Sequence, residues 1–503
     1  MLLLACTVAV ISALVPLGFQ GRDDLHYVTA AEQWLRSGPT IGQDHWANRL
    51  PYILAILEVF SITGNWETAL YLLHGLCFVA TATLIWMIAR RSFDNPAVAR
   101  FGLAVLFTTP LLFRTVSYFY PEALEVALGA VTVVLVLSRR AHNGSSRRLW
   151  LVVAGLIGGV VLSIRQTELA IPAALALLIL LDSSEPLAMR FRDVASLAAG
   201  YAAPVMLELA CYWIFTGDPL HRLAVDSRHI DLVSPNRLRG GVPPASTRVL
   251  FNWDLASRWN IPSTVQSHWT ISPIVRLFTS PGMLLTPWFA LIGSVCAWRA
   301  GGAALQLTKL LLLAVVVQWV LNTFVLSLPP NTRYFGVSLA LMCILAGVAL
   351  AQIPSRPIAI ATWFSLFLLP CTIVAVIEPR PSLTVALVSS AANQPGPPLH
   401  LSAGVAKLAV LRISDDAIFA RRTSTGSPPP GATVAVLAHE KSTYLTKRCG
   451  DGQTAFSQFA KLVPRSSLWT AVQKLGGGTR IPGRVRQQLI GESDAVYLLN
   501  RRC

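Results

Sequence analysis

The sequence predicts an α-helical polytopic membrane protein with about 11 transmembrane helices, followed by a small C-terminal α/β domain. The first observation is composition: of 503 residues, 53% are hydrophobic and only 13% are charged, against about 25% charged residues in soluble domains. The second is that the apolar residues form runs of roughly the 20 residues that cross a bilayer. The third is a more charged sequence, broken by Pro and Gly, after residue 377. A water-soluble enzyme, a disordered chain and a secreted disulfide scaffold are excluded.

Eleven apolar runs are candidates for transmembrane helices. We interpret the first as an uncleaved span, because it lacks the charged start and the small-residue cleavage site of a signal peptide. A miscount by one span would reverse the orientation of the second half of the chain. The runs cover residues 2–19, 67–89, 97–116, 122–138, 149–164, 167–182, 194–215, 282–298, 308–328, 335–353 and 358–377.

The basic residues between these runs predict the orientation. Five successive short connections contain Arg or Lys, and all fall on one side, which the positive-inside rule makes cytoplasmic. The other side receives a first loop at 20–66, a large loop at 217–281 and the C-terminal region. We therefore expect a multi-pass protein of the cell inner (plasma) membrane, surrounded by membrane lipids, with its active site and C-terminal domain outside the cytoplasm.

The net charge of +16, from 41 Lys and Arg against 25 Asp and Glu, would suggest a nucleic-acid partner in a soluble protein. Here the cytoplasmic loops explain part of it, and residues 380–503 contribute +10, with 16 basic and 6 acidic residues. We expect no nucleic-acid partner. The sequence has no CxxC motif and no tight histidine spacing, so it predicts no metal site.

The extracytoplasmic loops are unusual. In the first loop, apolar residues recur at helical spacing from Leu25 to Leu35, and Pro51–Phe60 is a second apolar stretch too short to cross a membrane. Trp and Tyr residues favour the membrane surface, so we expect both to be interfacial helices. The large loop at 217–281 is polar and long enough to cover a site.

The C-terminal region, 378–503, predicts a small extracytoplasmic α/β domain. Thr433–Ala438 and Ala495–Leu499 have the pattern of strands, while Thr454–Leu462 and Ser467–Leu475 have the pattern of helices. This region contains two cysteines, which are expected to form a disulfide in an oxidising compartment. Two unpaired thiols are the alternative. The disulfide candidates are Cys449 and Cys503.

The sharpest local feature is Arg22–Tyr27, directly after the first span. Asp23 and Asp24 open an interfacial helix, where carboxylates suit the helix N-terminus, and they face a bilayer that could present a lipid-linked substrate. When a sugar moves to a hydroxyl or amine, a carboxylate can take the acceptor's proton as the oxocarbenium-like centre develops. Two merely solvated surface acids are the alternative.

The pattern Asp23-Asp24-x-His26-Tyr27-x-x-Ala30-Ala31, ending at Gly38, resembles the first-loop motif of the GT-C glycosyltransferases. The resemblance is to the branch of protein O-mannosyltransferases and the lipid A aminoarabinose transferase, and it covers residues 1–377. This chain departs from the family with Asp24 in place of a Glu, Glu122 in place of an Asp, and one proline where the family has a pair. Further matching segments follow in order: Asp44–Tyr52, Tyr120–Glu122, Ser163–Gln166 and Asn331–Phe335.

The resemblance implies a transmembrane catalytic body that transfers a sugar from a polyprenyl-phosphate donor to a lipid, glycan or protein acceptor, with inversion. It makes Asp23 the catalytic acid of the family, supported by Asp24 and Glu122. Arg165 and Arg333 would hold the donor phosphate, since Arg offers phosphate a bidentate fork; isolated anchors at span ends are the alternative. No cofactor besides the lipid-linked donor is expected, and metal dependence is left open. The other candidates for substrate binding are Tyr334, His45, Arg49 and Glu168, the last as an i,i+3 partner that orients Arg165.

Two other functions fit the composition. A polytopic transporter or flippase should show repeat-related halves with interrupted spans, and neither is visible in the sequence. A protein like the O-antigen ligases or polymerases of the cell envelope would depend on a large late loop, for which 217–281 is a moderate candidate. Two weaker site candidates are Arg114 and Glu208, the latter an intramembrane acid without a partner nearby in sequence.

Overall fold

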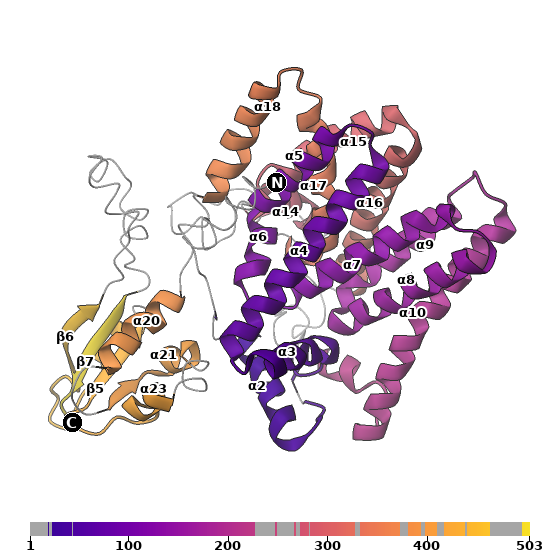
Figure 1. Ribbon diagram of the computed structural model, residues 1–503. Coiled ribbons are helices and arrows are strands. Elements are labelled where there is room, and N and C mark those ends of the chain that lie inside the picture. The colour runs from indigo at the N-terminus through magenta and orange to yellow at the C-terminus, as the bar shows by residue number, and fades with distance from the viewer. Residues whose placement is uncertain are drawn as a thin grey trace.

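The computed structural model is mostly helical (Figure 1). The predicted first span at 2–19 falls outside the described residues except for Phe19, and most of the large loop at 217–281 falls outside them too. The structure describes Phe19 and residues 23–42, 44–226, 247–248, 266–267, 272–280, 282–326, 332–372, 381–393, 398–409, 417–437, 440–462 and 495–503.

In this part of the chain, five helices are long and apolar enough to cross a membrane, judged by length and composition. The prediction of a helical membrane protein is confirmed, whereas the count of eleven spans is supported only in part. The five are α4 (Trp66–Ser92), α8 (Gly144–Ile164), α10 (Leu187–Thr216), the stretch Gly302–Val325, which begins with α16 (Gly302–Val320), and the stretch Thr332–Ala351, which contains α17 (Gly336–Ala351).

Shorter helices complete the body. α7 (Glu122–Leu137) packs against α4 and α8, and its last turn lines the same cavity as the last turn of α4, so the two helices begin at the same end of the body. The remaining elements of the body are η1 (Ser138–Ala141), η2 (Gln166–Leu169), α9 (Ala170–Leu180), β1 (Thr247–Arg248), β2 (Gln266–Ser267), α14 (Ser272–Thr279), α15 (Thr286–Ala300), η3 (Leu321–Val325), η4 (Thr332–Phe335), α18 (Arg356–Trp363) and η5 (Phe364–Leu368).

One predicted span, 97–116, is wrong as a single helix. The structure divides it into α5 (Pro96–Thr108) and α6 (Pro110–Ser117), with Thr109 in an extended conformation between them. Pro110 has no backbone N–H and disfavours the helical conformation of the residue before it, so the helix stops there and restarts at the proline.

α17 is the centre of the helical body. Nearly every residue of this helix is buried, and it packs closely against α5 and α15. A side chain at Gly102 or Gly347 would meet the backbone of the other helix, and Gly293 of α15 lies equally close to the backbone of α17. Small residues at such crossings allow helix backbones to approach, which strengthens packing inside a membrane.

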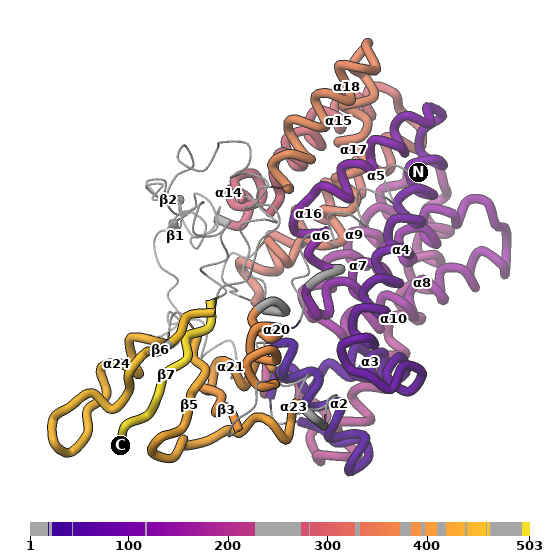
Figure 2. The backbone as a smooth tube through the Cα atoms, turned by 60° about the vertical axis from the view of Figure 1, so that its left-hand side comes forward, coloured from indigo at the N-terminus to yellow at the C-terminus, as the bar shows by residue number. Residues whose placement is uncertain are grey.

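Two short helices lie across one end of the body. α2 (Asp23–Ser37) and α3 (Leu50–Thr63) occupy the positions of the predicted interfacial helices, and both figures place them at the end opposite α18 (Figures 1 and 2). Tyr27 of α2 packs edge-on against Tyr52 of α3, with ring centroids 4.9 Å apart. The Tyr52 hydroxyl then hydrogen-bonds His74 of α4 at 2.9 Å, which fixes α3 on the body.

The C-terminal region forms a mixed five-stranded sheet in the order β4-β3-β5-β7-β6. β3 pairs with β4 and β5 in parallel, whereas β7 pairs antiparallel with β5 and β6. The sheet lies at the same end of the body as α2 (Figure 2). Its elements are α20 (Pro381–Ala392), β3 (Leu399–Leu401), α21 (Ala403–Leu408), α23 (Ala417–Arg422), β4 (Thr423–Ser424), β5 (Thr433–Leu437), α24 (Lys441–Leu445), β6 (Phe456–Leu462) and β7 (Val496–Arg501).

The predicted strands at 433–438 and 495–499 are confirmed by β5 and β7. The predicted helix Thr454–Leu462 is wrong, because this segment is β6. A β-bulge between Gln458 and Ala460 interrupts the alternation of side chains, so the apolar residues follow no period of two in the sequence. The other predicted helix, Ser467–Leu475, lies outside the described residues.

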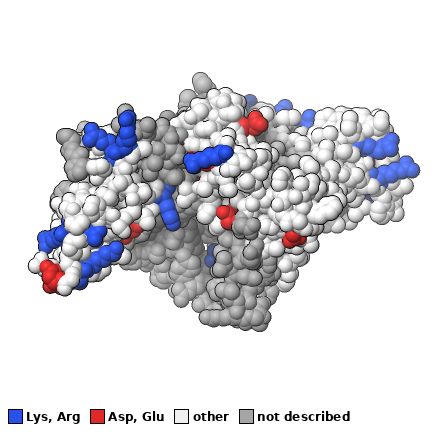
Figure 3. Space-filling view, turned by 90° about the horizontal axis from the view of Figure 1, so that it is seen from below, with Lys and Arg blue, Asp and Glu red and all other residues white. Residues whose placement is uncertain are grey.

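The charged surface is uneven. Seen from the end that carries α2, the helical body exposes few charged side chains, whereas Lys and Arg gather over the C-terminal sheet at the left of the view (Figure 3).

Cys449 and Cys503 are joined by a disulfide, with their Cα atoms 6.0 Å apart. The bond closes a loop of 54 residues and ties the end of the chain to the segment before β6. Closing a loop of this length removes enough entropy from the unfolded chain to stabilise the domain by about 4 kcal/mol. We therefore expect Cys503→Ser to make the 440–462 segment strongly sensitive to protease in the full-length protein.

Cleavage in this segment can be followed by mass spectrometry under native conditions. Cys296→Ser, which removes a cysteine outside any disulfide, is the matched control. Equal protease resistance of the Cys503→Ser variant and the wild type would contradict a stabilising role for the disulfide.

Candidate active site

The two acids that open α2 have different surroundings. The Asp23 side chain is 31% exposed, and its Oδ2 lies 3.6 Å from Nη1 of Arg333 in an ion pair. Asp24 is fully buried, and its Oδ1 accepts a hydrogen bond from the backbone N–H of Leu25 at 3.1 Å. Asp23 is therefore the acid of this pair that a molecule arriving from outside can reach, and Asp24 fixes the start of the helix.

Arg165 lies at the centre of a buried ion-pair cluster. It follows the end of α8 and extends toward the first turn of α7. Its Nη2 donates to Oε1 of Glu122 at 2.5 Å, and its Nη1 is 3.1 Å from Oε2 of Glu125. The exposed fraction of Arg165 is 6% and that of Glu125 is zero, so these charges are matched away from water.

Glu122 links this buried cluster to Asp23. The same Oε1 atom that accepts from Arg165 is 3.8 Å from Nε of Arg333. Arg333, with one third of its side chain exposed, thus bridges the accessible Asp23 and the buried Glu122. The Glu122 carboxylate is thus shared by two guanidinium groups, one buried and one partly exposed beside Asp23.

Glu168 does not have the position that the sequence predicted. In the described part of the chain, the ion-pair partners of Arg165 are Glu122 and Glu125, which come from α7, and the predicted i,i+3 pair with Glu168 is not formed. Glu168 is buried beside Glu125 instead. The predicted partner was wrong because Arg165 precedes η2 in an extended conformation, which turns its side chain away from the helical i,i+3 position.

Aromatic rings line the same cluster. The guanidinium carbon of Arg165 lies 5.8 Å from the centre of the Tyr334 ring, and that of Arg49 lies 5.5 Å from the centre of the Tyr27 ring. The Tyr27 hydroxyl is buried without a hydrogen-bond partner among the described residues. Burial raises the pKa of Tyr27 well above its usual range, so the hydroxyl keeps its proton and is available as a donor.

A second network joins the first loop to the start of the large loop. Arg49 Nη2 hydrogen-bonds His45 Nε2 at 2.7 Å, and Nδ1 of His45 pairs with Asp226. Asp226 also lies 3.4 Å from Nε of Arg222. Burial by itself would raise the pKa of Asp226, but the bond to His45 and the charge of Arg222 hold it below its ordinary value.

Arg222 also explains the intramembrane acid Glu208. Its Nη1 donates to Oε1 of Glu208 at 2.6 Å and to the carbonyl of Ser163 at 2.8 Å. The sequence interpretation missed Arg222 and Asp226 as site neighbours. Their i,i+4 spacing, with opposite charges just after the helix end at Gly217, was the available signal.

The structure therefore brings most of the predicted site residues to one end of the body. One group surrounds Arg165. The second group lies next to it, because Arg49 of the second group contacts the ring of Tyr27, which lines the first. In the part of the chain that the structure describes, no three His, Cys, Asp or Glu residues are arranged to hold a metal ion. The residues of the first group are Asp23, Glu122, Arg165, Arg333 and Tyr334, and those of the second are His45, Arg49, Arg222 and Asp226.

Residues 49–208 match the family described as dolichyl-phosphate-mannose-protein mannosyltransferase. No curated protein sequence matches the chain.

Three solved structures align with this chain, and the two with TM-scores above 0.5 share its fold. The crystal structure of ArnT from Cupriavidus metallidurans in the apo state aligns with a TM-score of 0.52 at 12% identity, over 89% of this chain and 94% of that one. The structure of the same protein bound to undecaprenyl phosphate aligns with a TM-score of 0.53 at 13% identity, over 91% and 95%. The Archaeoglobus fulgidus oligosaccharyltransferase aligns with a TM-score of 0.48 at 12% identity, over 81% of this chain and 61% of that one. The family match and the ArnT fold together confirm the predicted resemblance to the GT-C glycosyltransferases and the predicted enzyme class.

Proposed function

From a chain with the GT-C glycosyltransferase fold, we infer an enzyme that transfers a sugar from a polyprenyl-phosphate donor to an acceptor on the extracytoplasmic side of the membrane. The observation that carries this proposal is the ion pair of Asp23 with Arg333 at 3.6 Å. It joins an accessible carboxylate, suited to accept a proton, to an accessible guanidinium, suited to hold a phosphate.

The donor class rests on the accessible guanidinium of Arg333 and on two similar proteins. The family that matches residues 49–208 is named for dolichyl-phosphate-mannose, and one similar ArnT structure contains undecaprenyl phosphate. Both lipids are polyprenyl phosphates. In this chain, Arg333 is the partly exposed candidate for binding the phosphate. The buried Arg165 acts on it through Glu122, the carboxylate that both arginines contact.

The proposed reaction is a single displacement. An Asp23 carboxylate oxygen takes the proton of the acceptor hydroxyl or amine, and the acceptor atom bonds to the anomeric carbon from the face opposite the phosphate. The bond from that carbon to the phosphate oxygen breaks, and its electron pair stays on the polyprenyl phosphate. Arg333 and Arg165 stabilise the charge that develops there. Attack from the opposite face inverts the anomeric configuration.

The resting ion pair suggests an order of events. Donor phosphate competes with Asp23 for Arg333, since both are anions that a guanidinium binds. Once the phosphate holds Arg333, the Asp23 oxygen is released toward the acceptor. Asp24 and Glu122 keep the two groups in place, because Asp24 fixes the helix start and Glu122 contacts both arginines.

We assign residues 1–377 to the catalytic membrane body and residues 378–503 to an extracytoplasmic α/β domain. The basic residues of the short connections support this orientation. The acceptor is a hydroxyl or amine of a lipid, a glycan or a protein.

Arg333→Gln tests the donor assignment. We expect the KM for a labelled polyprenyl-phosphate sugar to rise about 10- to 100-fold, the range for losing a charged hydrogen-bond partner. Arg333→Lys should recover part of this loss, because it keeps the charge without the bidentate fork. Arg36→Gln, at an exposed residue of α2, is the control. If membranes with and without the protein incorporate the label equally, the transferase function itself is wrong; if only the KM is unchanged, the donor role of Arg333 is wrong.

A further inference from the structure

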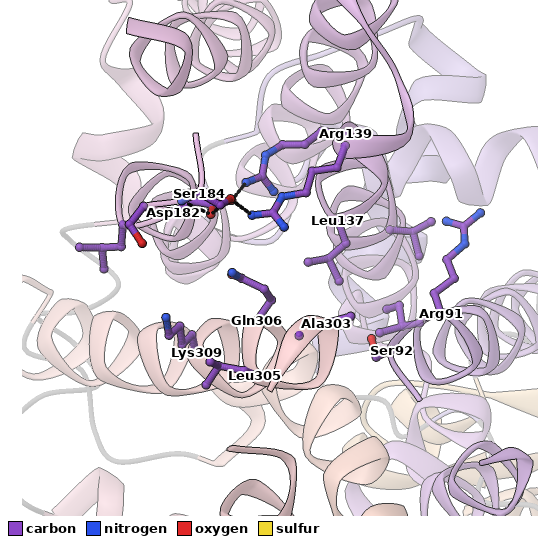
Figure 4. A pocket seen from close by; sticks show the side chains of 16 residues that line it. Arg91, Ser92, Leu137, Arg139, Asp182, Ser184, Ala303, Leu305, Gln306 and Lys309 are labelled. Atoms are coloured by element: carbon purple, nitrogen blue, oxygen red, sulfur yellow. Dashed lines mark hydrogen bonds and ion pairs between the residues drawn. The ribbon is translucent and has the colours of Figure 1, made fainter. Parts of the chain in front are cut away.

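A cavity of about 430 Å³, drawn in Figure 4, is lined by residues at the end of the helical body away from Asp23. Its walls come from the ends of α4 and α7, the connection from α9 to α10, and the start of α16. α7 separates the two places, because Glu122 opens this helix and the cavity residue Leu137 ends it, about 22 Å away at 1.5 Å per residue. The cavity is therefore no part of the candidate active site.

The ion pairs beside the cavity balance one another. Arg139 Nη2 lies 2.7 Å from Oδ2 of Asp182, which also pairs with Arg140. Arg147, behind them, pairs with Glu185 at 2.5 Å and with Asp193. Three arginines thus face three carboxylates, and this network alone would attract no anion.

Two further cations line the cavity without such compensation. Lys309 of α16 has no carboxylate within ion-pair distance among the described residues, and the same is true of Arg91. Arg91 donates to the hydroxyl of Ser138 at 2.5 Å. The cavity therefore carries a surplus of two positive charges, which is the charge that a phosphate group neutralises.

The geometry also suits a phosphate group. Figure 4 shows Lys309 and Gln306 extending from one helix toward the wall that carries Asp182 and Arg139, with Arg91 and Ser92 on a further side. Hydroxyl and amide groups next to the cations can donate further hydrogen bonds to phosphate oxygens. The other lining residues include the apolar Ile88, Val134, Leu137, Leu181 and Leu305.

We propose that this cavity, which has Lys309 at one end and Arg91 at the other (Figure 4), binds a phosphate-bearing anion. Two sources share this chemistry: the headgroup of an anionic phospholipid and free phosphate. The apolar lining favours the phospholipid, because acyl chains can lie against it while the headgroup meets the cations. The orientation predicted from the basic connections would make this a site for lipids of the cytoplasmic leaflet.

The test uses full-length protein and the double variant Arg91→Gln/Lys309→Gln. Wild-type protein in detergent is mixed with phosphatidylglycerol or phosphatidylcholine, and retained lipid is measured by native mass spectrometry. In a parallel arm, inorganic phosphate is added and the thermal midpoint is measured. The control is Arg100→Gln/Arg148→Gln, which removes two exposed charges at α5 and α8 outside the cavity.

We expect wild type and control to retain phosphatidylglycerol in preference to phosphatidylcholine, and the double variant to bind it about tenfold more weakly. A phosphate-dependent rise of the midpoint in wild type and control, but not in the double variant, also supports the site and identifies free phosphate as a source. Equal binding of both probes by the wild type and the double variant would overturn the proposal. So would an equal loss in the control, because the effect would then be one of net charge. Lys309→Gln alone gives the same comparison if the double variant does not fold.

Discussion

Replacing Asp23 by Asn is expected to lower the rate of sugar transfer by at least about 100-fold, the lower range of general-base catalysis. Asn has nearly the same shape, but it cannot accept the acceptor's proton. The side chain is only partly buried, and its ion pair with Arg333 is at the accessible edge of the cluster. The protein should therefore insert and fold normally, and the loss should appear in kcat more than in the KM for the donor.

The measurement is single-turnover transfer from a labelled polyprenyl-phosphate sugar in membranes with matched protein levels. Glu32→Gln, in the same helix, is the control. Glu32 pairs with Arg36 of α2, which is not a residue of the candidate active site. Transfer at the wild-type rate in the Asp23→Asn variant would exclude Asp23 as the base while leaving the transferase function intact.

Replacing Arg165 by Met is expected to remove both activity and stability. The change leaves Glu125 buried without its guanidinium partner and leaves Glu122 with Arg333 alone, 3.8 Å away. Removing one partner of a buried ion pair lowers the free energy of unfolding by about 3–5 kcal/mol, because the remaining charge is not solvated. The thermal midpoint of the purified protein should fall markedly, and donor-dependent transfer should be lost.

A triple variant, compared with Glu122→Gln/Glu125→Gln alone, separates the two effects. Arg165→Met combined with Glu122→Gln and Glu125→Gln removes the unpaired charges, so the midpoint should recover while transfer stays lost. Recovery of transfer along with stability would mean that Arg165 has only a structural role. An unchanged midpoint in the single variant would mean that the cluster does not stabilise the fold.

The sequence predicted the class of the fold because that depends on local patterns. Apolar runs indicated the helices, and the spacing from Leu25 to Leu35 indicated α2. The break between α5 and α6 was missed because the sequence is apolar on both sides of it. Pro110 itself was the residue that indicated a helix end. The strand β6 was missed because its bulge appears only in the pairing with β7.

The site was predictable as a set of residues but not as a set of contacts. Asp23 and Arg333 are far apart in the sequence, and only the resemblance to a family placed them in one site before the structure paired them. For Arg165, the local spacing rule pointed to Glu168, whereas the partners come from a different helix. Which charged residues form ion pairs inside a membrane depends on how the helices pack, and this packing cannot be predicted from any one segment of the sequence.

The close crossings of α17 limit how this sequence can change. An added methyl carbon would lie 1.8 Å from a backbone atom of the neighbouring helix at Gly293 and 2.5 Å from one at Gly347, distances that only glycine permits, while at Gly102 the contact would be a tight 3.3 Å. A relative that carries a larger residue at one of these positions must have moved a helix or accepted a compensating change in its neighbour. Substitutions at these sites should therefore occur together, whereas the lipid-facing surface of α10, with only 11% of its span buried, can exchange apolar residues freely.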